Sequence, residues 1–175
     1  MPTAEVIEAG ELLLRAGQGP LTIEDILDEV EGARYELIDG CLYVSPNGDV
    51  MHQLIATRCA TFLATLIPAG LRAFAGINVI DGPKTIIGPD VAVADLEAMA
   101  YRGLGVTPQG VLLAVEITSP STRRRDLTIK RDLYREWGVP YVIVDRRGPL
   151  SVQVEGDLPD YGRALVDAVP ELSAP

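Results

Sequence analysis

The feature that most constrains the fold of this chain is an apolar segment that contains one carboxylate. The segment reads Val111-Leu-Leu-Ala-Val-Glu116-Ile-Thr-Ser119, and its length and composition predict a buried β-strand. Because side chains alternate along a strand, Glu116 faces the same side as Leu112, Ala114 and Thr118. A buried carboxylate without a partner costs on the order of several kcal/mol. We therefore expect Glu116 to be paired, protonated or bound to a metal, with an arginine as the simplest partner.

A second acid opens another predicted strand. In Pro89-Asp90-Val-Ala-Val-Ala94, the residues on the same face as Asp90 are small, which leaves room for a partner. Two acids at the edges of adjacent strands provide hard oxygen ligands for Mg²⁺ or Mn²⁺, and Mg²⁺ prefers one or two carboxylates together with water and substrate phosphate. Such an ion activates water and neutralises charge on a scissile phosphate. The two acids therefore indicate phosphodiester hydrolysis.

The remaining pattern predicts an α/β fold in the order helix, β-hairpin, helix, several strands, helix, two strands. Thr22 and Asp25 resemble a capping pair before a short helix, and Asp39-Gly40 suits a two-residue hairpin turn that requires positive φ. The predicted elements are a helix at 23–30, hairpin strands at 34–38 and 41–45, a helix at 50–67, strands at 71–80, 90–95 and 111–118, a helix at 123–137, and strands at 141–145 and 150–154.

The length of 175 residues and the apolar content of 47% suit one compact domain. We expect residues 1–20 to form a leader or loosely attached segment, residues 21–155 to form the domain, and residues 156–175 to form a C-terminal extension of it. Because no secretory signal and no run of about 18 apolar residues is found, we expect a cytoplasmic protein that does not bind a membrane. Cys41 and Cys59 lack the spacing of zinc ligands and are expected to be structural thiols.

Charge is distributed unevenly along the chain. The net charge of −10 and the pI near 4.5 argue against non-specific coating of nucleic acid. Residues 121–135 are nonetheless cationic, and Arg123, Arg124 and Arg125 near a helix start are candidates for phosphate contact. The alternative for this run is a solvated basic face.

Lys130 is the best candidate for a catalytic cation. It follows the Glu116 strand on the next predicted helix, where Asp126, Lys130 and Tyr134 are spaced i, i+4 and i+8 and share a face. A lysine near two acids could orient the attacking water or stabilise the transition state. The alternative is an exposed Asp126–Lys130 pair worth a few tenths of a kcal/mol.

Several motifs, taken in order, resemble the Uma2 family of restriction-endonuclease-like proteins over roughly residues 21–155. They are Tyr35-Glu-Leu-Ile-Asp-Gly40, Met51-His-Gln53, Pro89-Asp90-Val, Val115-Glu-Ile-Thr-Ser-Pro-Ser-Thr122, the spacing of Asp126, Lys130 and Tyr134, and Gly138-Val-Pro-Tyr-Val-Ile-Val-Asp145. That family is similar to the PD-(D/E)XK nuclease superfamily. The resemblance implies a restriction-endonuclease-like core, in which a central mixed β-sheet is flanked by helices, with an N-terminal helix and β-hairpin.

The resemblance also implies roles for individual residues. It makes Asp90 and Glu116 the metal-binding acids and Glu36 a further catalytic acid, although a surface or arginine-paired acid is the alternative for Glu36. Thr118 stands where the superfamily motif has its lysine, two residues after Glu116. Proteins similar to Uma2 carry a lysine on the following helix instead, which is Lys130 here.

His52 and Gln53 match an HQ pair at the start of a helix in the family. We favour a structural or capping role for His52, while Gln53 could touch the site from the same helix turn. Asp126 and Tyr134 are further accessory candidates.

Three functional hypotheses follow. The first is a Mg²⁺- or Mn²⁺-dependent endonuclease that cleaves DNA. The second is a non-catalytic protein that uses the nuclease-like fold for binding or oligomerisation, which the acidic pI and Thr118 favour. The third is a phosphohydrolase of small nucleotides. Because restriction-type folds commonly pair, a homodimer is a further expectation, and no base-reading module is recognisable.

Overall fold

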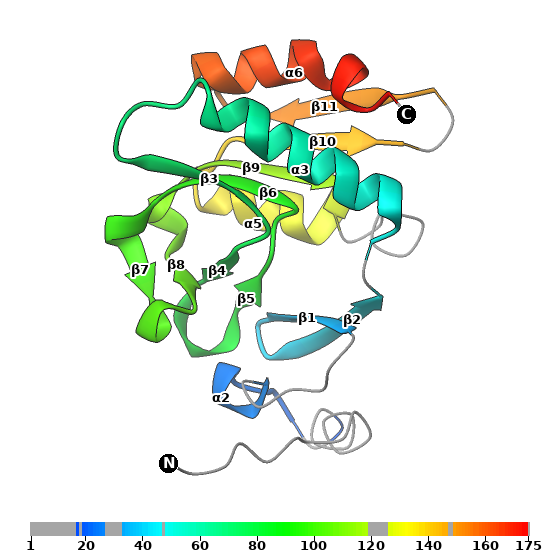
Figure 1. Ribbon diagram of the computed structural model, residues 1–175. Coiled ribbons are helices and arrows are strands. Elements are labelled where there is room, and N and C mark those ends of the chain that lie inside the picture. Colours follow the sequence, from blue (N-terminus) through cyan, green and yellow to red (C-terminus); the bar gives the residue numbers. More distant parts are fainter. Residues whose placement is uncertain are drawn as a thin grey trace. The chain divides into compact units, whose positions relative to one another are not determined.

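The computed structural model describes residues 17, 19–26, 33–46, 48–118, 126–146 and 149–174 of the chain (Figure 1). Contacts between residues divide the chain into two compact units. The first consists of Met1–Asn47 and Ile80–Ile87, and the second consists of Gly48–Val79 and Gly88–Pro175.

The first unit contains a β-hairpin. Strand β1 (Ala33–Ile38) pairs antiparallel with β2 (Cys41–Pro46) and also pairs antiparallel with β5 (Ile86–Ile87). Asp39 and Gly40 form the turn with φ angles of 51° and 79°. Asparagine, aspartate and glycine tolerate positive φ best, which is why this dipeptide turns the chain in two residues. The predicted hairpin is confirmed.

A short helix precedes this hairpin. Helix α2 (Ile23–Ile26) begins where the backbone N–H and the hydroxyl of Thr22 both donate to Asp25 Oδ2, at 2.8 and 2.7 Å. These bonds are the capping interaction expected of the two residues. The remainder of the predicted helix, residues 27–30, lies outside the described residues.

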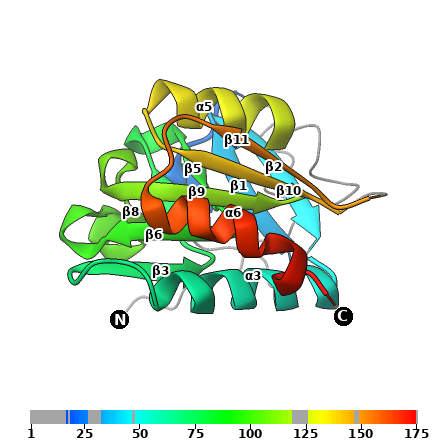
Figure 2. The ribbon, with the colours of Figure 1, turned by 90° about the horizontal axis from the view of Figure 1, so that it is seen from above.

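A five-stranded mixed sheet forms the centre of the second unit, in the order β11-β10-β9-β6-β3 (Figure 2). Strands β9 and β10 are parallel, and the other neighbouring pairs are antiparallel. A parallel pair needs a crossover connection, and here α5 lies in the crossover. The strands are β3 (Leu71–Ala75), β6 (Val91–Asp95), β9 (Val111–Ile117), β10 (Tyr141–Asp145) and β11 (Ser151–Glu155), and the helices are α3 (Val50–Ala64), α5 (Arg131–Glu136) and α6 (Asp160–Leu172).

Helices α3 and α6 cover one face of this sheet (Figure 2). Their buried residues pack on alternate residues of the central strands, so the strands present a continuous apolar face. The cluster includes Ile55, Cys59 and Leu63 of α3, Leu165 and Val169 of α6, and Val91, Val93, Leu113, Val115, Ile117, Val142 and Val144 of the sheet. In the part of the chain that the structure describes, no helix is both long and apolar enough to cross a membrane.

Helix α5 covers the opposite face of the sheet (Figure 2). Small residues line the centre of this face, because Ala92 and Ala114 are partners in the β6–β9 register and both are fully buried. Tyr134 of α5 packs its ring on Tyr141 of β10, with ring centroids 4.6 Å apart. Glu116 points to this face, since it alternates with the residues that meet α3 and α6.

The two cysteines are free thiols in different environments. Cys41 is exposed and Cys59 is fully buried in the core beneath α3. Burial raises the pKa of the Cys59 thiol to about 11, so it stays protonated and inert at neutral pH.

The predicted elements differ most from the structure in three places, while several other ends shift by one residue. Helix α3 ends at Ala64 instead of residue 67. The predicted strand 71–80 divides at Gly76, whose φ of 84° ends β3 before β4 (Asn78–Ile80) begins. Helix α6 was not predicted, because Pro159 and Pro170 obscure its apolar period.

The remaining short elements are η1 (Gly82–Lys84), η2 (Leu96–Ala98), β7 (Met99–Ala100), η3 (Tyr101–Gly103), β8 (Gly105–Val106) and η4 (Pro108–Gly110).

Candidate metal and catalytic site

Two acids lie opposite each other at one edge of the five-stranded sheet. Asp90 immediately precedes β6, and Glu116 is the penultimate residue of β9. The antiparallel register pairs Val91 with Val115, so continuing it by one residue places Asp90 opposite Glu116. Opposed residues share a face, with Cβ atoms about 4.5–5.5 Å apart. Both carboxylates are buried, since Asp90 is 6% exposed and Glu116 is 2% exposed.

Two donors hold the carboxylate of Asp90. Its Oδ2 accepts a hydrogen bond from the backbone N–H of Ile117 at 2.8 Å and another from Nε2 of His52 at 3.0 Å. In its ionised form the Asp90 carboxylate can only accept, and Nε2 of His52 is then the donor. The donors come from β9 and from α3, so two elements on different sides of Asp90 fix its orientation.

His52 reaches Asp90 because α3 begins beside it. Asp49 caps the helix by accepting the backbone N–H of His52 at 2.7 Å, and Nη1 of Arg146 lies 3.2 Å from the same oxygen. Gly48 lies against the imidazole, where a Cβ would approach Nδ1 to 2.3 Å. Asp49 therefore supplies the cap, while the ring of His52 is bonded to Asp90.

Replacing Asp49 with alanine is expected to lower the free energy of unfolding by about 1 kcal/mol at pH 7, the usual cost of losing an N-cap. The backbone hydrogen bond from His52, aided by Arg146, lowers the pKa of the Asp49 carboxyl below its ordinary value of 3.8. The ionised Asp49 carboxylate therefore stabilises the fold fully above pH 3.8, and this stabilisation is lost as the pH falls through the lowered pKa. Asp49→Asn should keep most of the cap at pH 7 but lose this acid-dependent part. Urea denaturation at pH 7 and pH 3 measures both, and an alanine variant as stable as the parent at pH 7 would contradict the assignment.

Glu116 forms a buried ion pair with Lys130. The Nζ of Lys130 contacts Oε1 of Glu116 and donates to the carbonyl of Gly88 at 3.2 Å. Lys130 is only 1% exposed, so the alternative of an exposed pair with Asp126 is wrong. Glu116 is therefore paired, which was one of the three expected states, and its partner is a lysine. Burying two charges costs several kcal/mol per ion, which excellent geometry and further hydrogen bonds must offset.

An irregular turn carries Lys130. The segment η5 (Asp126–Lys130) is a π-helix that continues directly into α5. Within the described residues, the predicted helix at 123–137 is therefore a π turn followed by an α-helix. Single π turns within helices are rare and occur frequently at functional sites.

A third buried acid lies at the same sheet edge. Asp145 ends β10, and its Oδ1 accepts a hydrogen bond from the hydroxyl of Thr118 at 3.0 Å. Asp145 is 6% exposed and Thr118 is 1% exposed. Asp145 was not expected to be a site residue, although an acid that ends the apolar run Tyr141-Val-Ile-Val-Asp145 is the kind of signal that singled out Glu116. Thr118, which stands at the place of the superfamily lysine, is thus bonded to an acid on the neighbouring strand.

Comparison with known families shows the family of the chain. The model of the Uma2 family, whose description is "Putative restriction endonuclease", matches residues 22–162. The chain belongs to the Uma2 family. The resemblance inferred from its motifs is confirmed, and membership supports a nuclease at the level of the family.

A solved structure shares the Uma2 fold seen here. The crystal structure described as "a putative nuclease belonging to DUF820" from Anabaena variabilis is similar with a TM-score of 0.64 and 18% sequence identity, over 88% of this chain and 98% of that chain. At this identity the likeness shows the fold alone, and it confirms the expected restriction-endonuclease-like α/β architecture. No curated protein matches the chain.

The other candidate residues of this Uma2 chain lie in varied environments. Glu36 belongs to the first unit, on β1, and is 1% exposed, so the alternative of a surface acid is wrong. Gln53 is exposed on α3, and its side chain makes no hydrogen bond with the described residues. Tyr134 is fully buried and also meets Trp137, with centroids 5.8 Å apart. Arg123, Arg124, Arg125 and the side chain of Asp126 lie outside what the structure describes.

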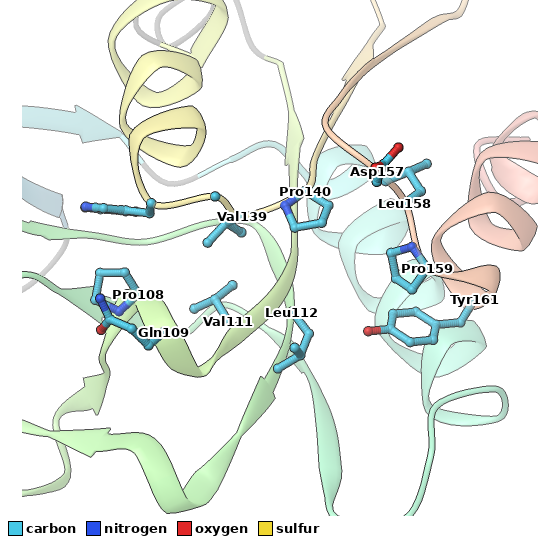
Figure 3. A pocket seen from close by; sticks show the side chains of 12 residues that line it. Pro108, Gln109, Val111, Leu112, Val139, Pro140, Asp157, Leu158, Pro159 and Tyr161 are labelled. Atoms are coloured by element: carbon cyan, nitrogen blue, oxygen red, sulfur yellow. The ribbon is translucent and has the colours of Figure 1, made fainter.

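A cavity of about 420 Å³ lies at the other end of β9 (Figure 3). Val111 and Leu112, which begin β9, line it together with Pro140 from the loop before β10 and Tyr161 from α6. Burial raises the pKa of the Tyr161 hydroxyl. Glu116 and Asp145 lie at the opposite ends of their strands, so this cavity is separate from the acidic edge.

The donor set at the acidic edge fits a hard divalent cation. Asp90 and Glu116 offer two carboxylates. The carbonyl oxygen of Gly88 is a third oxygen nearby, because Lys130 contacts both this carbonyl and Glu116. Among the described residues no group of three or more His, Cys, Asp or Glu side chains is arranged to hold a metal. Two carboxylates without a complete protein cage are nevertheless the set that Mg²⁺ uses when water and substrate phosphate complete its shell.

Proposed function

We propose that this Uma2 protein is a Mg²⁺-dependent endonuclease that hydrolyses DNA phosphodiester bonds, with Mn²⁺ as an alternative ion. The observation that carries the proposal is the opposed, buried pair Asp90 and Glu116 with the ammonium of Lys130 on Glu116. Family membership supports a nuclease, and acids at the ends of adjacent strands supply the oxygens that phosphodiester hydrolysis requires.

Asp90 and Glu116 would hold the ion. When bound, Mg²⁺ supplies Lewis-acid stabilisation of the charge on the scissile phosphate and lowers the pKa of a water. His52 and the backbone N–H of Ile117 keep Asp90 in a fixed orientation, so little reorganisation is needed on binding. Lys130 would orient the attacking water or donate to the phosphate from the side of Glu116.

Substrate contacts beyond these residues are part of the same proposal. Arg123, Arg124 and Arg125 precede η5 in sequence and are proposed to contact DNA phosphates, which requires charge but no base reading. The catalytic role implied for Glu36 stays a prediction, as does a homodimer.

Incubating the full chain with supercoiled and linear duplex DNA tests the proposal. We expect nicking or cleavage in the presence of Mg²⁺ or Mn²⁺ and none with excess chelator. Asp90→Ala and Glu116→Ala should both abolish the activity, because each removes a proposed ligand. Arg135→Gln is the matched control, since Arg135 lies on α5, which directly follows the π turn of Lys130, and makes exposed pairs with Asp132 and Glu155. Full metal-dependent cleavage by both acid variants would overturn the assignment.

A second candidate function is a binding or assembly module without catalysis. The observation in its favour is that Thr118 replaces the superfamily lysine and is engaged with Asp145. Titration calorimetry with Mg²⁺ and Mn²⁺ separates the two functions, because an endonuclease needs an Asp90-dependent metal site and a binding module does not. A small-nucleotide phosphohydrolase would show the same metal site but would cleave mononucleotides in place of DNA.

A further inference from the structure

The ammonium of Lys130 lies where oxygen ligands for a cation converge. Its Nζ contacts Oε1 of Glu116 and the carbonyl of Gly88, which is two residues before Asp90. Gly88, Glu116 and Lys130 are all buried. A carboxylate and a backbone carbonyl are hard oxygen ligands of the kind that Mg²⁺ and Ca²⁺ also take. In the structure these oxygens are occupied by a protein cation.

The charges at this sheet edge also indicate that Lys130 takes the place of a bound cation. In their ionised forms Asp90, Glu116 and Asp145 carry three negative charges at this edge, and Lys130 contributes one positive charge on Glu116. The adjacent Arg131 is directed elsewhere, with Nη1 3.8 Å from Oε1 of Glu155. Lys130 therefore acts as the counter-ion of Glu116.

We propose that Lys130 is an exchangeable counter-ion, so that a divalent cation on Glu116 and the Lys130–Glu116 ion pair exclude one another. This inference rests on the proposed function, because it concerns the same metal site. A divalent cation on Oε1 of Glu116 repels an ammonium at the same oxygen. Lysine suits such an exchange because its charge sits on a flexible four-carbon stem, and the Gly88 carbonyl already serves Nζ as a second acceptor.

The exchange couples metal loading to the release of the lysine. Without the ion, Lys130 is engaged with Glu116, and with the ion its ammonium is freed beside the acids, where the proposed reaction needs a cation. By linkage, the ion pair and the metal oppose each other to the same extent in both directions. Removing the ammonium should therefore strengthen metal binding even though it removes a proposed catalytic group.

Lysine-selective NMR tests this on the wild-type chain. Lys84 and Lys130 are the two lysines of the sequence, so ¹³Cε-labelled lysine gives two sites, and exposed Lys84 is the internal reference. Lys130→Gln assigns the signals. We expect saturating Mg²⁺ to shift the Lys130 signal and leave the Lys84 signal unchanged. An unmoved Lys130 signal, under conditions where calorimetry shows Asp90-dependent Mg²⁺ binding, would overturn the exchange while leaving the proposed function intact.

Calorimetry of variants with Mn²⁺ gives the second readout. Lys130→Gln should raise the Mn²⁺ association constant by about tenfold or more, because a unit charge is removed within a few ångströms of the site. Arg131→Gln removes a charge from the neighbouring residue and should leave the constant unchanged. If Lys130→Gln binds Mn²⁺ no tighter than the parent, the exchange is refuted. If the parent itself shows no Asp90-dependent binding, the proposed metal site fails instead. Circular dichroism verifies that each variant folds. If Lys130→Gln does not fold, the shift of the wild-type lysine NMR signals on addition of Mg²⁺ decides whether the exchange occurs.

Discussion

Replacing Lys130 with methionine is expected to lower the free energy of unfolding by about 3–5 kcal/mol, the usual cost of breaking a buried ion pair. The substitution keeps an unbranched apolar stem but leaves Glu116, which is 2% exposed, without its cation. Methionine fills most of the volume of the lysine stem, so the lower free energy of unfolding results from the missing charge and not from a cavity. Glu116→Leu, which leaves the ammonium buried without its carboxylate, should cost a similar amount.

The double variant Lys130→Met/Glu116→Leu separates charge from packing. Because both charges are removed together, we expect it to recover to within about 1 kcal/mol of the parent or to exceed it. Arg135→Met is the matched control, because it breaks exposed pairs with Asp132 and Glu155 and should cost at most about 1 kcal/mol. Chemical denaturation followed by circular dichroism gives all four values. A Lys130→Met variant within about 1 kcal/mol of the parent would mean that the ion pair is not buried as described.

If the apolar double variant is as stable as the parent, the buried pair has a reason outside stability. Two well-packed apolar side chains of similar volume would suit the face beneath α5, which is otherwise lined by residues such as Ala92 and Ala114. Real proteins depart from local rules mainly at functional sites. The ion pair of Lys130 and Glu116 is such a departure, and it lies beside Asp90, where the proposed metal site would be.

The sequence contained enough information to locate both acids. An acid inside or at the start of an apolar strand is a strong signal, because burial of a carboxylate is costly, and the structure shows both Asp90 and Glu116 buried at one edge. Helical spacing also put Lys130 and Tyr134 on one shared face, and both are buried in the structure. The π turn could not be foreseen, because its side-chain period differs little from that of an α-helix over one turn.

Other parts of the site depend on pairings between distant segments. The Gly88 carbonyl is a backbone atom and leaves no mark in the sequence, and the Thr118–Asp145 bond arises only because β9 and β10 lie side by side. Helix α6 was missed for a local reason, since Pro159 and Pro170 interrupt the apolar period of Leu165 and Val169. Proline immediately before a helix is well tolerated, and Pro170 falls near its end.

Replacing Tyr134 with alanine is expected to lower the free energy of unfolding by about 3–5 kcal/mol, as for other large aromatic residues in cores. Tyr134 is fully buried, and its ring packs on Tyr141 and meets Trp137 edge-on. Tyr134 therefore packs α5 against the sheet and so positions the π turn that carries Lys130. The loss of this ring should also reduce any metal-dependent cleavage, because the position of Lys130 depends on the helix.

Tyr134→Phe distinguishes packing from chemistry. Phenylalanine keeps the ring contacts and removes only the hydroxyl, so we expect the free energy of unfolding to change by at most about 1.5 kcal/mol. If Tyr134 acts by packing, the phenylalanine variant keeps the full cleavage rate at saturating Mg²⁺. A large fall in that rate with unchanged stability would instead show that the hydroxyl takes part in the reaction. The accessory role inferred from the spacing of Asp126, Lys130 and Tyr134 would then be chemical, and the helix would contribute two reactive groups to the acids in place of one.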